Sequence, residues 1–343
     1  MAWRHGRWSA DHPLPIGASE RANIGQAVRA GDVLAAGTTY GTPVRVAGAR
    51  RVGVAPDDLD RVMRVPVGAE VVRGQIIART GRRFARVASA PTDGRVIHRR
   101  ADGDFHVAPV VGRWVVRSTL DGTVTRSDDS CVSVEGAAWC LQGVAAYGPD
   151  AVGEIVVGVG APTEELSPSR IDVRLQGKIL VGGARTNAEA ITRAHACGVG
   201  ALITGAVPAG GLRVVYGEEI GAAGARGASD APTVLCLLGF GTAALPRQIF
   251  APLAALDGTR AAVHTASARL FAFAPPDAGL AQDDPSLVLA DDWGGVRAIE
   301  EQMGLAGTTR FPSEMEAEAV STGDGMMPVA NVLAFDAPRD PVT

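Results

Sequence analysis

The stretches "IGQAVRAGDVLAAG" (residues 24–37) and "VGAEVVRGQIIART" (residues 67–80) are two copies of one pattern. They share G-x-x-V-x-x-G-[DQ]-[VI]-[IL]-A, so that Gly25 and Gly31 match Gly68 and Gly74. Val, Ile and Leu alternate with polar residues at the period of a β-strand, and the glycines mark tight turns or bulges. The first half of the chain therefore contains a repeated β unit.

Asp-Gly dipeptides recur in the segments that flank the second copy. They lie between runs of alternating apolar residues in 87–107 and 118–134. Because Asp-Gly is favoured in tight hairpin turns, we expect turns at Asp93-Gly94, Asp102-Gly103 and Asp121-Gly122.

The second copy and its continuation, "GAEVVRGQIIA…SAPTDGRV", follow the motif G-x-x-V-x-x-G-x-x-[IL]-A…[SA]-P-x-x-G-x-[VI]. Residues 22–147 thereby resemble the barrel-sandwich hybrid, the fold of biotinyl and lipoyl domains and of a structural module in ion-translocating quinone-reductase subunits. The resemblance implies a β domain over residues 22–150, preceded by an N-terminal extension, residues 1–21.

The carrier lysine of that family is missing here. It stands on the hairpin between the half-motifs, where this chain has "ARTGRRFARVASAP", and the one lysine of the chain is Lys178. The CxxCxxCxxxCP motif of iron–sulfur subunits is also absent from the sequence. We therefore expect no cofactor, and interpret the hairpin as a partner-docking element with candidate residues Arg82, Arg83, Phe84 and Arg86.

From residue 151 to 275 the periodicity predicts a small α/β domain. Apolar runs predict strands in 151–162, 177–183, 199–207, 231–241 and 258–275, and helices in 186–198 and 245–256. Thr186 and Glu189 predict a capping box, Gly198 closes that helix, and strand 199–207 should run parallel to 177–183. The glycine-rich stretch 208–232 is interpreted as a loop.

The segments "GKILV", "AHACGVGALITG" and "APTVLCLLGFG" make residues 170–245 similar to protease-associated or swivelling β/β/α domains. The resemblance implies a non-catalytic module that binds a ligand or partner, although "GFG" departs from the usual ending.

The glycine loop after strand 177–183 matches neither G-x-G-x-x-G nor GxxxxGK[ST]. We interpret it as a turn, with an anion site at the helix N-terminus as the alternative. The candidate ligand residues are Gly182, Gly183, Arg185, Thr186, Gly239, Phe240 and Gly241.

The last predicted segment, residues 276–343, comprises a linker and an acidic domain. Four or five short strands, with a turn at residues 323–325, resemble an SH3-like or KOW-type barrel. Residues 277–343 hold 3 Arg against 13 Asp and Glu, a net charge of −10. Since that charge repels phosphates, we interpret the barrel as structural or protein-docking.

Charge is polarised along the chain. Residues 1–120 hold 19 Arg against 10 Asp and Glu, a net charge of +9. The basic and acidic ends could attract each other within one chain or between chains. Nucleic acid is the alternative partner for the basic end, but its arginines are spread over strands and turns rather than clustered.

The remaining features argue against membrane insertion, secretion and catalysis. No apolar run approaches the ~20 residues of a membrane span, and the first residues lack a secretory signal. Four cysteines without CxxC spacing suit a reducing cytoplasm and burial. The six histidines lie in no HxxxH, HExxH or GxSxG context, so we predict no catalytic or metal-binding residue.

The sequence predicts a multi-domain, β-rich α+β protein: a barrel-sandwich hybrid, a small swivelling-type α/β domain and an SH3-like barrel. The favoured function is a non-enzymatic scaffold or protein-binding assembly subunit. One alternative is a small-molecule sensor or enzyme with a pocket in the α/β domain. A second is a cofactor-free peripheral subunit of a membrane redox complex.

Overall fold

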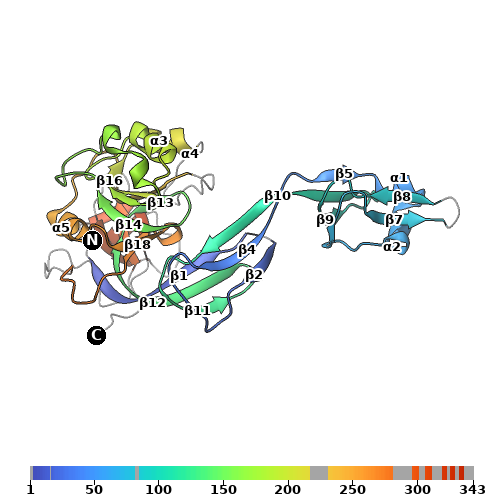
Figure 1. Cartoon of the computed structure of the whole chain (residues 1–343), viewed down its shortest axis with the longest axis horizontal. Coiled ribbons are helices and arrows are strands. Elements are labelled where there is room, and N and C mark those ends of the chain that lie inside the picture. The colour runs from blue at the N-terminus through green and yellow to red at the C-terminus, as the bar shows by residue number, and fades with distance from the viewer. Residues whose placement is uncertain are drawn as a thin grey trace. The chain divides into compact units, whose positions relative to one another are not determined.

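The protein is a β-rich α+β chain with several sheets (Figure 1). A computed structural model describes residues 3–15, 17–81, 85–216 and 231–280, together with the backbone of five short strands beyond residue 295. Contacts divide the chain into two units. The first comprises residues 1–13, 22–34 and 117–343, and the second comprises residues 14–21 and 35–116.

One 11-stranded sheet organises the first unit. In sheet order its strands are β13 (Ala145–Tyr147), β17 (Thr233–Phe240), β16 (Ala201–Val207), β15 (Ile179–Val181), β14 (Ala151–Val157), β18 (Arg260–His264), β19 (Arg269–Ala272), β12 (Cys131–Gln142), β11 (Gly122–Ser127) and β3 (Ala27–Val28), with β1 (Arg4–Pro13) also paired to β12. Because β12 pairs with β19, the sheet holds strands from both sides of the boundary expected at residue 150.

Strands β14 to β17 are parallel neighbours, which confirms the parallel arrangement expected for 177–183 and 199–207. Every residue of β15 and β16 is buried, as in strands covered on both faces. Helix α3 (Ala188–Ala196) connects β15 to β16, α4 (Ala209–Tyr216) connects β16 to β17, and α5 (Arg247–Ala255) follows β17. Figure 1 shows α3 and α4 side by side next to β16.

Two local predictions in this unit are wrong. Helix α4 lies in the segment interpreted as a loop, because Leu212 and Tyr216, one helical turn apart, are both buried in the core. The rest of that segment, residues 217–230, lies outside the described residues. Helix α3 is capped by Asn187, whose side chain accepts from the Ala190 amide, and not by Thr186. Gly198 does follow the helix with φ +70°, as expected.

The second unit contains a six-stranded sheet and a hairpin. The sheet order is β2 (Ala18–Arg21), β4 (Val33–Tyr40), β10 (Phe105–Arg117), β9 (Gly94–Arg99) and β6 (Glu70–Val71), with β5 (Val44–Val46) paired to β10. Strands β7 (Ile76–Thr80) and β8 (Arg86–Ser89) form the hairpin. Two short helices, α1 (Gly48–Val52) and α2 (Leu59–Val62), pack with these strands around Phe105, Ile77 and Leu59.

The sequence repeat is also a structural repeat. Gly25 and Gly68 have φ of +85° and +93°, and Gly31 and Gly74 have φ of +98° and +85°, a region that favours glycine. The Gly31 amide donates to Ser118 O at 2.8 Å, and the matching Gly74 amide donates to Ala90 O at 2.9 Å. Each copy is therefore closed by a distant segment of the chain.

The closing segments are "STLDGTV" (118–124) for the first copy and "APTDGRV" (90–96) for the second. Val124 N donates to Gln26 O at 2.9 Å, and Val96 N donates to Ala69 O at 3.0 Å. Residues 24–34 of the first copy lie in the first unit, whereas residues 35–37 and the whole second copy lie in the second unit.

The hairpin predicted to turn at Asp121-Gly122 turns elsewhere. Strands β11 and β12 are joined at residues 128–130, where the Asp128 carboxylate accepts from the Ser130 and Cys131 amides. Asp121 instead lies directly before β11, which begins at Gly122, and its side chain bonds to the first repeat copy, as described below.

The C-terminal residues contribute a separate five-stranded antiparallel sheet, consistent with the four or five short strands expected. Its order is β23 (Gly325–Pro328), β22 (Ala319–Thr322), β21 (Ala306–Arg310), β20 (Val296–Glu300) and β24 (Val332–Phe335). No helix among the described residues is long and apolar enough to span a membrane. None of the four cysteines forms a disulfide, and all four are buried, as predicted.

Candidate functional site

The predicted ligand-loop residues lie on both sides of β16, at the carboxyl ends of the parallel strands. Gly182 N donates to Ile203 O at 2.7 Å, Thr186 N donates to Ala206 O at 3.3 Å, and Gly241 N donates to Val207 O at 3.0 Å. The structure therefore brings the two loops to one strand. Because these three amides donate to carbonyl oxygens of β16, they are not available to an anion, which favours a structural turn.

Two polar atoms of the glycine loop are buried without a hydrogen-bond partner among the described residues, Thr186 Oγ1 and Arg185 Nε. An open groove of about 740 Å³ lies over α3. It is lined by Pro168, Ser169, Ala188, Glu189, Thr192, Arg193, Ala196 and Val214.

The predicted docking hairpin is only partly described. Arg82, Arg83 and Phe84 lie outside the described residues. Arg86 is the first residue of β8, where it pairs with Thr80, and it is exposed to solvent. The β7–β8 pairing confirms a hairpin at this place.

The second unit as a whole is basic and apolar at its surface. Residues 35–116 hold 14 Arg against 7 Asp and Glu, a net charge of +7. Of the 13 large hydrophobic side chains exposed among the described residues, nine lie in this segment. They are Val44, Val67, Val72, Ile76, Val87, Ile97, Val110, Val111 and Val115. The exposed apolar side chains could not be predicted from the sequence, because alternation along a strand does not tell which face a neighbouring layer covers.

Two histidines and a carboxylate meet in the first unit. Potential ligand atoms of His12, Asp150 and His264 lie within 4.8 Å of one another, and both histidines are buried. The spacing would suit a metal ion. Sequence reasoning missed the cluster because β1 and β18 are far apart in the chain.

The hydrogen bonds of this cluster already engage the histidine nitrogens. Thr119 N donates to His12 Nε2 at 3.1 Å, which leaves the ring proton on Nδ1, 3.3 Å from Val132 O. His264 Nε2 lies 2.9 Å from Asp11 O, so it carries the proton and Nδ1 accepts from Ser267 Oγ at 2.6 Å. A metal ion would have to displace these bonds, so we assign the cluster to structure.

The surroundings of His12 favour its neutral form. Burial, with the neighbouring His264, lowers the pKa of His12 to about 4, and Asp150 and Asp11 act in the opposite direction. A buried thiol is likewise held inert elsewhere in the core, since burial raises the pKa of Cys236 to about 12.

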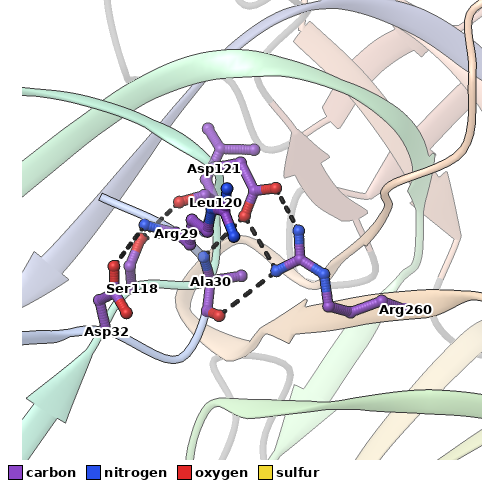
Figure 2. Close-up of polar contacts among 7 residues, drawn as sticks. All are labelled: Arg29, Ala30, Asp32, Ser118, Leu120, Asp121 and Arg260. Carbon is purple, nitrogen blue, oxygen red and sulfur yellow. Dashed lines mark hydrogen bonds and ion pairs between the residues drawn. The ribbon is translucent and has the colours of Figure 1, made fainter. Parts of the chain in front are cut away.

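Asp121 connects the first repeat copy to its closing segment and to β18 (Figure 2). Its Oδ1 accepts from Ala30 N at 2.7 Å and from Arg260 Nη1 at 3.1 Å, and its Oδ2 accepts from Arg260 Nη2. Arg260 Nη1 also lies 3.5 Å from Ala30 O. The guanidinium is thus seated on a carboxylate and a backbone carbonyl at once.

Comparison with known proteins names no relative: no family model, no curated protein and no solved structure matches this chain.

Proposed function

We propose that this protein is a non-enzymatic assembly subunit that binds protein partners through its second unit. The observation that carries the proposal is the gathering of exposed Val and Ile side chains and of arginines in residues 35–116. Apolar area removed from water stabilises a complex by roughly 25 cal/mol per Å². Arginine is enriched at the centre of protein interfaces.

The chemistry of the partner follows from the charge. A surface with a net charge of +7 attracts an acidic protein surface, and this attraction weakens as salt screens it. The acidic segment 277–343 of a second copy is one surface of this kind.

The site chemistry is consistent with a binding role. The sequence has no lysine in the hairpin where carriers attach their cofactor. The His12 and His264 nitrogens are engaged in hydrogen bonds, and Cys236 is held as a thiol.

A capture experiment with paired variants tests the proposal. The tagged full chain would be isolated at low salt from its source cells, and associated proteins identified by mass. A variant with Val72, Val110 and Val111 changed to Ser should lose the associated proteins. The control Ile24→Ser with Val173→Ser, which changes two exposed aliphatic side chains of the first unit, should keep them.

Both variants would first be checked for wild-type circular dichroism and melting temperature. Equal capture by the two variants, or a lone wild-type monomer at every salt concentration, would contradict the proposal. Capture of the chain by itself alone would identify self-assembly.

We also propose the finer domain types. The proposal of a barrel-sandwich hybrid in residues 22–150 draws on the shared motif and its matching hydrogen bonds, although the two copies fall largely in different units. The parallel strands with intervening helices support a swivelling-type domain in 151–275, and the five-stranded antiparallel sheet supports an SH3-like barrel after residue 276.

A second candidate function is small-molecule sensing at the groove over α3. The groove volume of about 740 Å³ falls within the range of ligand pockets, and Glu189 and Arg193 supply charged groups. Thermal shift against a metabolite set tests this function. A stabilisation lost in Arg193→Gln but retained in an exposed-arginine control, Arg174→Gln, would favour it.

A further inference from the structure

Each repeat copy donates the same backbone hydrogen bond to an aspartate of its closing segment. Asp121 Oδ1 accepts from Ala30 N at 2.7 Å in the first copy, and Asp93 Oδ1 accepts from Arg73 N at 2.7 Å in the second. In the sequence alignment of the copies, Ala30 matches Arg73 and Asp121 matches Asp93. The backbone around both carboxylates is closed by matching hydrogen bonds, as described above.

The two copies differ in the side chain that contacts the aspartate carboxylate. In the first, Arg260 fills the space beside Asp121 and contacts both its oxygens (Figure 2). In the second, no side chain among the described residues donates to the Asp93 carboxylate, and a pocket of about 370 Å³ lies there instead. Within the part of the chain that the structure describes, one copy of the site holds a guanidinium and the other does not.

The lining of the pocket suits the same group. It is formed by Thr38, Glu70, Val71, Val72, Gln75, Asp93, Gly94 and Val110. Asp93 and Glu70 supply negative charge inside a unit that is basic overall. Val72 and Val110 are exposed, so they offer an apolar wall for the methylene stem of a long cationic side chain.

We infer that the Asp93 pocket binds an arginine side chain of a partner protein, in the way that Asp121 binds Arg260. Arginine is specified over lysine because its planar fork can donate to a carboxylate and a neighbouring carbonyl together, as Arg260 does with Asp121 and Ala30. The inference rests on the proposed function for the source of the arginine, whereas the pocket itself can be tested without a partner.

The test is a titration of the full ¹⁵N-labelled chain with N-acetyl-arginine amide, followed by amide chemical shifts. Saturable shifts are expected at Arg73, Asp93 and Gly94. The citrulline analogue, which replaces the guanidinium by a neutral urea, should cause none, and the lysine analogue should bind several-fold more weakly. Shifts of equal size with citrulline or lysine, or no shifts with arginine, would overturn the inference.

Variants of the chain sharpen the test. Asp93→Asn keeps an oxygen for the Arg73 amide but removes the charge, so the shifts should be lost. The control Asp57→Asn removes an exposed carboxylate elsewhere in the second unit and should leave them unchanged. Binding that persists in Asp93→Asn would also overturn the inference.

Arg260→Ala supplies a positive control within the chain. Vacating Asp121 should create a second site, so that the same probe also shifts Ala30, Asp121 and Gly122. A variant that responds only at Asp93 would show that the two copies do not share the guanidinium-binding geometry, and would remove the basis of the inference. A failed titration leaves the capture experiment standing, so the two proposals can fail separately.

Discussion

Acidification should destabilise the first unit through His12. The side chain is 1% exposed, and burial together with His264 lowers its pKa from 6.5 to about 4. As the pH falls below 6.5, His12 binds a proton in the unfolded chain but stays neutral in the folded chain. The stability associated with neutral His12 is therefore complete above pH 6.5 and is lost progressively between pH 6.5 and about 4.

The size of the loss follows from the two pKa values. Since each pKa unit corresponds to 1.36 kcal/mol, the difference amounts to about 3 kcal/mol in full and about 2 kcal/mol between pH 7.5 and 5. Asp128, whose pKa is lowered by hydrogen bonds from Ser130, loses its contribution only below its ordinary value of 3.8. The window from pH 6.5 to 5 therefore separates the His12 contribution from that of Asp128.

Urea denaturation of the wild type and of His12→Gln at pH 7.5 and 5.0 measures this term. The variant should lose about 2 kcal/mol less on acidification than the wild type, whatever its stability at pH 7.5. The control His195→Gln, on the exposed side of α3, should lose as much as the wild type. If wild type and His12→Gln show equal losses, the reasoning is refuted.

Four further substitutions test the fold around the candidate sites. Gly122→Ala would place a Cβ 2.0 Å from Glu135 O, so we expect a loss of at least about 2 kcal/mol in urea denaturation, whereas Gly112→Ala, with its nearest atom at 4.0 Å, should be tolerated. Asp121→Asn should cost about 1 kcal/mol by weakening the half-exposed Arg260 pair, and the cost should shrink in 1 M salt; a salt-independent loss would contradict this. Asn187→Ala should lower the free energy of unfolding by about 1 kcal/mol through the lost cap. Thr186→Val should be neutral or stabilising, because it removes a buried hydroxyl without a partner; a destabilised Thr186→Val would restore Thr186 as the cap.

The parts of the fold that could be predicted from the sequence depend on local signals. Apolar periodicity located the strands of the parallel sheet, and the glycine spacing of the repeat matched four positive φ angles. The errors arose where distant contacts decide. Asp121-Gly122 has the composition of a hairpin turn, but its carboxylate is held by Ala30 and Arg260.

The candidate sites were still harder to predict. His12 and His264 meet only because β1 and β18 belong to one sheet, and neither has a motif around it. The Asp93 pocket could not be predicted from the sequence, because the two copies look alike there. The sequence shows two aspartates in equivalent places, and only the fold shows that Arg260 reaches one of them.

The pairing of the first strand has a consequence for synthesis of the chain. Trp8 donates its indole N–H to Ala138, 130 positions later, and β1 pairs with β12 along its whole length. At roughly 5–20 residues per second, a ribosome needs on the order of ten seconds to make that partner. During this interval the nascent segment that carries Trp3 and Trp8, both buried in the folded chain, has no β12 to pair with, so its backbone and indole groups are exposed to solvent and to chaperones.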